Sequence, residues 1–122
     1  MLATNLLIKF PVVMITIFVI DALWLITVGR WGLQIAEKIQ GFSVRFRIIP
    51  AIIVYIALAY LLIQSKSLIN AVGIGIATYV VYDFTTLAIL EKYDWRLALA
   101  DAVWGGILFG SSWKILNYYG WI

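Results

Sequence analysis

The stretch Thr78-Tyr79-Val80-Val81-Tyr82-Asp83-Phe84-Thr85-Thr86 decides the fold class, because it sets a single acid in the middle of a long apolar run. From Leu68 to Leu90 the only charged residue is Asp83. An ionised Asp at the centre of a bilayer is unfavourable by about 2.5–3.5 kcal/mol, and such residues usually face protein or a wet cavity. The rest of the chain is therefore expected to supply partners for Asp83.

The composition is typical of an integral membrane protein. Of the 122 residues, 65% are hydrophobic and only 12% are charged. In soluble domains, about 45–50% of the residues are apolar and about 25% are charged. The chain has no Cys and no His, which excludes disulfides, thiolate nucleophiles, Ser–His triads and the usual ligands of zinc and haem. The net charge of +3 is too small and too scattered for nucleic-acid binding. We expect one transmembrane domain over residues 1–122, with no cofactor.

Four apolar runs predict four transmembrane helices, at about residues 6–29, 48–64, 68–90 and 95–117. The first run resembles a signal peptide, but it contains Asp21 and lacks a small-residue cleavage site, so we interpret it as a retained helix. Pro11 is expected in the first turn of this helix, where a missing N–H is tolerated, and Pro50 in that of the second. The short turns predict an all-α, up-down four-helix bundle.

The polar connection from Arg30 to Arg47 predicts a further element. Trp31, Ile35 and Ile39 recur in it at helical spacing, which indicates a short amphipathic helix in the membrane interface, closed by Gly41. An ordinary cytosolic connector fits this segment equally well. After the third span, Asp94 is suited to cap the N-terminus of the fourth helix.

The basic residues predict the orientation of the chain. Six of the nine Lys and Arg residues lie in the first and third loops, and these six are the expected contacts of anionic lipid headgroups. They are Arg30, Lys38, Arg45, Arg47, Lys92 and Arg96. The positive-inside rule then places these two loops in the cytoplasm and both termini on the opposite side.

Three of the four predicted helices each carry one acid. A rise of about 1.5 Å per residue places Asp21 and Asp83 roughly 13 and 12 Å from the boundary at the basic loops, and Asp101 roughly 7–8 Å from it. No Lys or Arg lies in this layer. Three unpaired ionised carboxylates would be unfavourable by roughly 8–10 kcal/mol if insertion values added. The acids are therefore expected to hold or share protons, or to surround a bound cation or a wet cavity.

The neighbours of two acids repeat. Asp21-Ala22-Leu23-Trp24 and Asp101-Ala102-Val103-Trp104 have the same form, with each Trp on the helical face of its Asp. Because the two helices are antiparallel, each indole N–H can donate to the carboxylate of the other helix if the helices are neighbours. Tyr79 and Thr86 lie four residues before and three after Asp83, on its face. The predicted polar cluster is Asp21, Asp83, Asp101, Trp24, Trp104, Tyr79 and Thr86.

Small residues predict close packing of the last two helices. On the fourth helix they recur every four residues, as do Ala71 and Gly75 on the third, and this spacing lets backbones approach. Those of the fourth helix are Ala98, Ala102, Gly106 and Gly110. Asp101 and Gly105 flank that ridge, so Asp101 is expected at or near the tight contact.

Three motifs resemble a known family. Asp21-Ala22-Leu23-Trp24-Leu25, Tyr82-Asp83-Phe84-Thr85 and Asp101-Ala102-Val103-Trp104-Gly105 are similar, in order and spacing, to hallmarks of the DUF2177 family of small predicted membrane proteins. The resemblance covers nearly the whole chain and implies its four-span layout. At Asp83 the family pattern is YDLTN, and Thr86 stands where Asn is usual. The family is named for its unknown function, so the resemblance supports the choice of residues and implies no reaction.

Several functions are compatible with these residues. The leading active hypothesis is movement of protons or cations through the cluster, as in a transporter or channel. Its rival is a structural or assembly subunit whose acids only specify helix packing, and a third is a pocket for a small ligand or lipid. An enzyme whose acids hold Mg²⁺ is less favoured, because no phosphate-binding or nucleotide motif accompanies them. The small size predicts a homo-oligomer or a subunit of a membrane complex.

Overall fold

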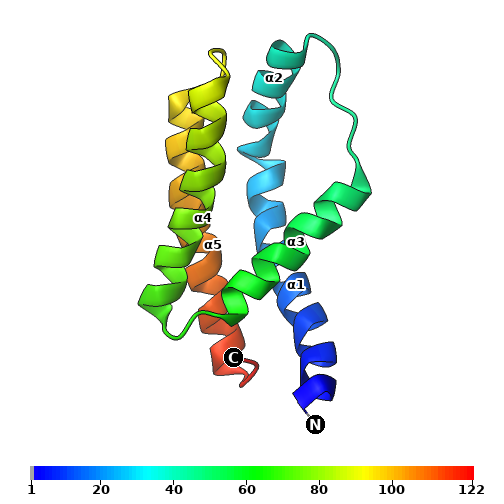
Figure 1. Cartoon of the computed structure of the whole chain (residues 1–122), viewed down its shortest axis with the longest axis vertical. Helices are drawn as coiled ribbons and strands as arrows, with labels where there is room; N and C mark the ends of the chain where they lie inside the picture. Colours follow the sequence, from blue (N-terminus) through cyan, green and yellow to red (C-terminus); the bar gives the residue numbers. More distant parts are fainter. Residues whose placement is uncertain (1) are drawn as a thin grey trace.

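The fold is all-α, as predicted. A computed structural model describes residues 2–122, with side chains from residue 5 onward. These residues form five helices and no strands (Figure 1). The helices are α1 (Leu2–Ile26), α2 (Gly29–Gln40), α3 (Ile48–Ile63), α4 (Leu68–Ile89) and α5 (Trp95–Tyr118).

The first helix begins and ends earlier than the apolar run suggested. Because α1 starts at Leu2, Pro11 lies inside the helix, so its predicted place in the first turn is wrong. A proline there removes one backbone hydrogen bond, and the flanking helical turns continue around it. Pro50 does lie in the first turn of α3, as predicted.

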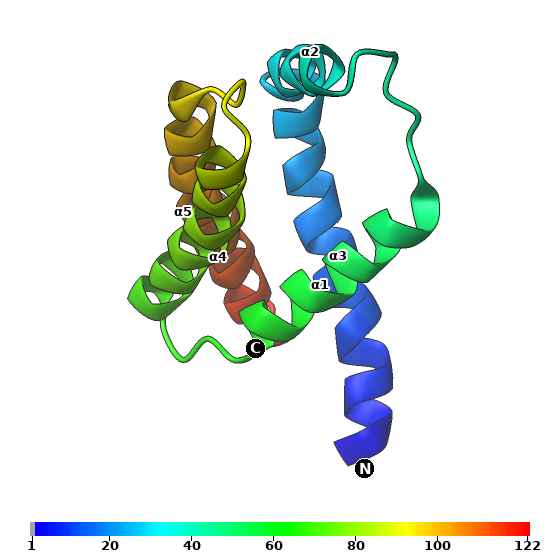
Figure 2. The same cartoon turned by 45° about the horizontal axis from the view of Figure 1, so that its top comes forward.

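The predicted amphipathic helix is present as α2. It buries Ile35 and exposes Glu37 and Lys38. Gly41 closes it in the left-handed conformation, with φ 85°, and donates its N–H to the carbonyl of Glu37 at 2.8 Å. The helix turns away from the axis of α1, as a comparison of Figures 1 and 2 shows. It lies at the same end of the molecule as the α4–α5 turn, whereas both termini lie at the opposite end (Figure 1).

The closest packing joins α4 and α5, which lie antiparallel along their length. Gly75 and Gly105 form the tightest contact, since a Cβ on either would come within 3.0 Å of the other's carbonyl oxygen. Gly106 and Gly110 extend this close approach along α5. The small-residue ridge therefore works as predicted, although its tightest point is at Gly105, beside the ridge.

The α4–α5 hairpin also has well-capped ends. The Ser67 hydroxyl accepts from the N–H of Asn70 at the start of α4. The Asp94 carboxylate accepts from the N–H of Arg96 at the start of α5, which confirms the predicted cap. These caps satisfy donors that a helix start leaves unpaired.

The third helix takes an oblique course across α1 and reaches α4 mainly through the turn that follows it (Figures 1 and 2). Leu58, Ala59 and Leu62 bury its inner face against Val13 and Ile17 of α1. The core continues into α5 at Leu108 and Phe109. The packing therefore comprises a tight hairpin and a looser half formed by the first three helices.

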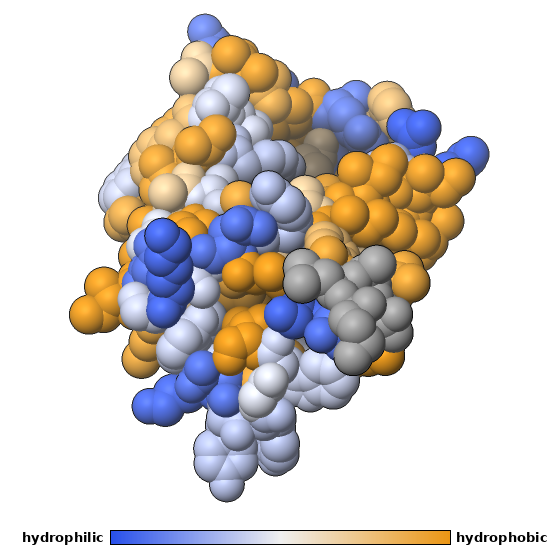
Figure 3. All heavy atoms as spheres, turned by 60° about the horizontal axis from the view of Figure 1, so that its bottom comes forward, coloured by the Kyte–Doolittle hydropathy of each residue, from blue (hydrophilic) through white to orange (hydrophobic). Residues whose placement is uncertain are grey.

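The lengths and compositions of the helices support a membrane location. Within the described residues, two helices are long and apolar enough to cross a bilayer: α1 over Asn5–Ile26 and α4 over Leu68–Ile89. The apolar helix α3 is shorter. Many large apolar side chains are exposed, among them Leu7, Phe46 and Ile69. At the end that carries the termini, hydrophilic residues adjoin hydrophobic ones (Figure 3).

Candidate functional site

The carboxylate of Asp21 connects three helices. It lies on α1 and is only 7% exposed. Its Oδ1 accepts from the indole Nε1 of Trp104 on α5 at 2.9 Å, and its Oδ2 accepts from the hydroxyl of Tyr55 on α3 at 2.6 Å. Each oxygen of this buried carboxylate therefore accepts a hydrogen bond, and these two bonds offset the unfavourable removal of the group from water.

The carboxyl of Asp101 on α5 is held by the matching indole. Trp24 of α1 donates its Nε1–H to Asp101 Oδ1 at 2.9 Å. The Trp24 and Trp104 rings stack between the two acids, with centroids 5.0 Å and planes 5° apart. The reciprocal pair of hydrogen bonds predicted from the repeated Asp-Ala-x-Trp motif is thus confirmed, as is the contact between α1 and α5 that it required.

Asp83 of α4 is fully buried and only half satisfied. Its Oδ1 accepts from the hydroxyl of Tyr93 in the α4–α5 turn. Its Oδ2 is buried and has no hydrogen-bond partner, and among the described side chains the other buried polar atom without a partner is Ser112 Oγ. The carboxyl of Asp101 lies beside it, and a hydrogen bond between the two acids requires that one of them carries a proton. Two ionised carboxylates offer only acceptors and cannot form that bond.

The register of α4 and α5 explains why these two acids meet. Gly75, Tyr79 and Asp83 follow one another every four residues and share a face of α4. Gly105 of α5 touches both Gly75 and Tyr79. Because the helices are antiparallel, one further turn along each brings Asp83 to Asp101. The close backbone approach and the acid pair thus lie on the same pair of facing ridges.

Two other residues of the predicted cluster have different outcomes. Tyr79 packs on Gly105, close to the acids, as its spacing from Asp83 predicted. Thr86 is not a partner of Asp83, because its hydroxyl donates to the carbonyl of Tyr82 at 2.8 Å. A threonine on a helix can always satisfy its hydroxyl on the preceding turn, so shared face alone was an insufficient signal.

Two donors of the site were missed in the sequence. Tyr55 comes from α3 and Tyr93 from a turn outside every apolar run. Tyr55 carried a signal, because it is one of only two ionisable groups in an otherwise apolar span. Burial, the hydrogen bond to Asp83 and the charge of Asp83 raise the pKa of Tyr93. The Tyr93 hydroxyl therefore stays protonated near neutral pH and remains a donor.

None of the three acids pairs with a basic side chain in the part of the chain that the structure describes. Among the described residues the one ion pair is between Arg96 and Asp94, at 3.0 Å and far less buried. In the same part of the chain, no three of the residue types His, Cys, Asp and Glu come together closely enough to hold a metal ion. The three acids that this Mg²⁺ arrangement would need are therefore not gathered into one such group among the described residues.

A groove of about 660 Å³ opens next to Asp21, between α1, α3 and α4. Its wall is apolar apart from Asp21 and the tyrosines Tyr55, Tyr79 and Tyr82. Its apolar lining consists of Met14, Ile15, Phe18, Leu25, Phe46, Ile48, Ala51, Ile52, Val54 and Leu58. A large apolar pocket with a few convergent polar groups is the usual form of a ligand site.

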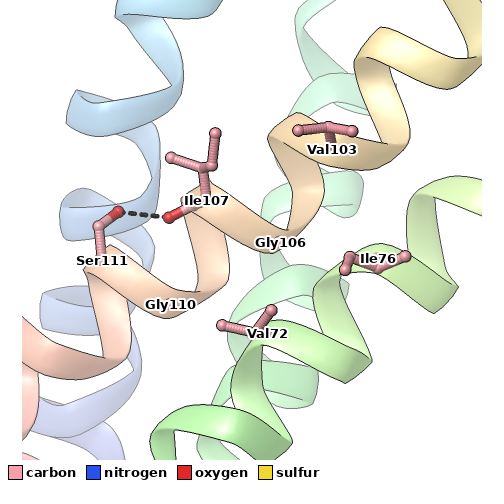
Figure 4. A pocket seen from close by; sticks show the side chains of 7 residues that line it. All are labelled: Val72, Ile76, Val103, Gly106, Ile107, Gly110 and Ser111. Carbon is pink, nitrogen blue, oxygen red and sulfur yellow. Dashed lines mark hydrogen bonds between the residues drawn. The ribbon is translucent and has the colours of Figure 1, made fainter.

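A second hollow, on the outside of the α4–α5 hairpin, lacks such groups. Figure 4 shows its lining, where Val72 and Ile76 of α4 face Gly106 and Gly110 of α5. The one polar side chain drawn there, Ser111, donates its hydroxyl to the carbonyl of Ile107 at 2.7 Å. This hollow of about 490 Å³ therefore follows from close packing and offers no free polar group.

The six predicted headgroup-binding residues are all exposed. Those on α2 and in the α4–α5 turn lie at the same end of the molecule (Figure 1). The six predicted residues are Arg30, Lys38, Arg45, Arg47, Lys92 and Arg96. Their contact with lipid stays a prediction.

Comparison with known proteins gives one match. The model of the family described as "Predicted membrane protein (DUF2177)" matches residues 6–114. No curated protein and no solved structure matches the chain.

Proposed function

Because the chain belongs to the DUF2177 family of predicted membrane proteins, we propose that it is a four-span membrane protein whose buried acids bind and pass protons or small cations. One observation carries this proposal: Asp83 Oδ2 is buried without a donor, beside the carboxyl of Asp101. An unpaired carboxylate oxygen in a dry protein interior is strongly unfavourable. A proton shared between Asp83 and Asp101 removes the repulsion and supplies the missing hydrogen bond.

The polar contacts around this pair suggest how protons reach it. Tyr93 links Asp83 to the α4–α5 turn, at the end of the molecule that carries the basic loops. On the other side, Trp24 and Trp104 connect Asp101 to Asp21 at the groove between α1 and α3. The acid pair thus lies between a surface turn and a groove that opens on another face.

The test compares wild type with Asp83→Asn in proteoliposomes that contain a trapped pH-sensitive dye. Wild type should show a proton or cation flux above that of empty liposomes, and Asp83→Asn, which is nearly isosteric, should reduce the flux to the empty-liposome level. Glu37→Gln is the matched control, because Glu37 is an exposed acid outside the cluster. No flux from wild type across several cations and pH values would refute transport.

The shared proton has a separate test that does not depend on transport. A protonated carboxyl gives its own carbonyl band in the infrared spectrum. This band should be present in wild type at neutral pH and absent in Asp83→Asn and in Asp101→Asn. A wild-type spectrum with no such band would show that both acids are ionised, and the proposed role of the pair would be wrong.

We also propose that the basic loops face the cytoplasm and that both termini lie outside. The chain has no Cys, so single cysteines give clean accessibility probes. A cysteine at Ser67, in the α3–α4 turn, should react with an impermeant maleimide in intact cells, whereas one at Lys92 should react only after lysis. The reverse pattern would invert the topology, and reaction of both would contradict four spans.

The alternative function, a packing role within a larger assembly, is favoured by the complete pairing of Asp21 with Trp104 and Tyr55. We propose for this case a homo-oligomer or a subunit of a membrane complex, in which the paired acid fixes how the helices pack. Each Asp→Leu variant should then melt at a lower temperature in detergent. Unchanged melting of all three would exclude a packing role.

A further inference from the structure

The groove between α1, α3 and α4 combines an apolar wall with one acidic side chain, that of Asp21. Of the residues that line it, Asp21 is the only one that is charged. None of the Lys and Arg residues of the chain lines it, and the described ion pair lies elsewhere, between Arg96 and Asp94. Among the described residues, no basic side chain therefore faces Asp21 in this groove.

The carboxylate at the groove retains capacity for a further donor. Asp21 accepts one hydrogen bond on each oxygen, from Trp104 and from Tyr55. A carboxylate has about four acceptor sites, so roughly two stay open. Asp21 is only 7% exposed and lies where the apolar wall adjoins the tyrosines Tyr55 and Tyr79.

The size and lining of the groove define the rest of the ligand. Its volume of about 660 Å³ is within the usual range of about 300–1,000 Å³ for small-molecule sites. Apolar side chains cover it from Met14 on α1 to Ile48 on α3, so the body of a ligand must be apolar. The carboxylate of Asp21 would repel an anionic headgroup. A neutral headgroup would form no ion pair with this carboxylate.

We propose that the groove binds a single-chain amphiphile with an ammonium headgroup, which places its alkyl chain along α1 and α3 and its nitrogen against Asp21. The proposed ligand is an organic cation bound by one acid of the cluster, so this inference rests on the proposed function, in which the acids bind cations. The ammonium donates to the open acceptor sites of Asp21, and Tyr55 holds the carboxylate in place for it.

The experiment uses the full chain in phosphatidylcholine nanodiscs with three dodecyl probes, each bearing a photoreactive diazirine: an amine, an alcohol and a carboxylate. The amine should label peptides of α1 and α3, and unlabelled dodecylamine should compete. Asp21→Asn should reduce this labelling at least tenfold, roughly the value of one hydrogen bond to a charged group. Equal labelling by amine and alcohol, or no effect of Asp21→Asn, would overturn the proposal.

A pair of alanines on α3 tests the groove without touching the acid. Ala51 lines it, whereas Ala57 is exposed and does not. Ala51→Trp should fill the groove and abolish amine labelling, and Ala57→Trp should leave it unchanged. This pair also decides the matter if Asp21→Asn does not fold.

The two proposals fail separately. If Asp83→Asn abolishes flux but wild type labels equally with amine and alcohol, the ligand class is wrong and proton movement stands. If the amine binds in an Asp21-dependent way but wild type gives no flux, the groove is a binding site and the proposed movement of protons is wrong.

Discussion

The indole rings of Trp24 and Trp104 lie face to face, with planes 5° apart, while each donates its N–H to the acid beside the other. The stack and the two hydrogen bonds reinforce one another, because shifting either ring along the helix axis breaks a hydrogen bond and the stacking together. This arrangement joins α1 to α5 and is the main polar connection between the two halves of the molecule.

The first prediction concerns the coupling within this arrangement. In a double-mutant cycle of Trp24→Phe and Asp101→Leu, each substitution removes the hydrogen bond. The two losses of unfolding free energy should be non-additive, with a coupling of about 0.5–3 kcal/mol, as for residues in one network. Unfolding by sodium dodecyl sulfate in mixed micelles provides the free energies. Trp95→Phe is the control, since Trp95 is exposed. Additive losses at Trp24 and Asp101 would show that the two side chains do not interact.

The second prediction concerns the buried acid on α4. Tyr93→Phe removes the donor to Asp83 Oδ1, and a buried acceptor left without a partner destabilises by about 1–3 kcal/mol. Tyr60→Phe should change the free energy of unfolding far less, because Tyr60 is exposed. The same detergent unfolding measures both. Equal effects of the two substitutions would contradict a hydrogen bond to Asp83.

The third prediction uses two glycines of α4. A methyl group at Gly75 meets the backbone of Gly105, whereas one at Gly73 meets nothing within 4 Å. Gly75→Ala should separate the helices and destabilise by about 1–3 kcal/mol or more. Gly73→Ala should leave stability unchanged or raise it by up to about 1 kcal/mol. Circular dichroism during thermal unfolding compares them, and a stable Gly75→Ala protein would contradict the close backbone contact.

The fourth prediction concerns pH and the cap of α5. Hydrogen bonds from Arg96 hold the pKa of Asp94 below its ordinary value of 3.8. A lowered folded-state pKa contributes stability above the unfolded value, and this contribution is lost as pH falls through the folded value. Asp94→Asn keeps the cap and removes the charge. The melting temperature of wild type should exceed that of Asp94→Asn at neutral pH, and the difference should close below pH 3.8. A difference that persisted in acid would not arise from the charge.

Sequence reasoning succeeded where the signal was local and periodic. The Asp-Ala-x-Trp repeats placed each indole on the face of its acid, and antiparallel helices then required the reciprocal contact that Trp24 and Trp104 make. The ridge at Gly75 and the cap at Asp94 follow from equally local rules. All of these depend on spacing within one helix and on the direction of its neighbour.

The failures concern which helices meet and at what angle. Nothing in the period of α3 shows that it crosses α1 obliquely, so Tyr55 could not be assigned to Asp21. Tyr93 lies in a turn, where no periodicity points its side chain. Thr86 shares the face of Asp83, but its hydroxyl is satisfied locally. The groove next to Asp21 is likewise a product of the oblique course of α3.

The separation along the chain of the paired residues has a consequence for biosynthesis. Asp21 and Trp104 are 83 residues apart, and Trp24 and Asp101 are 77 apart. When the ribosome has synthesised the first four helices, Asp21 has only Tyr55 as a donor, and Trp24 has no acceptor. The last helix brings both missing partners at once. Nascent chains released before α5 should therefore be recognised by membrane quality-control proteases, and completion of the chain should make it resistant to them.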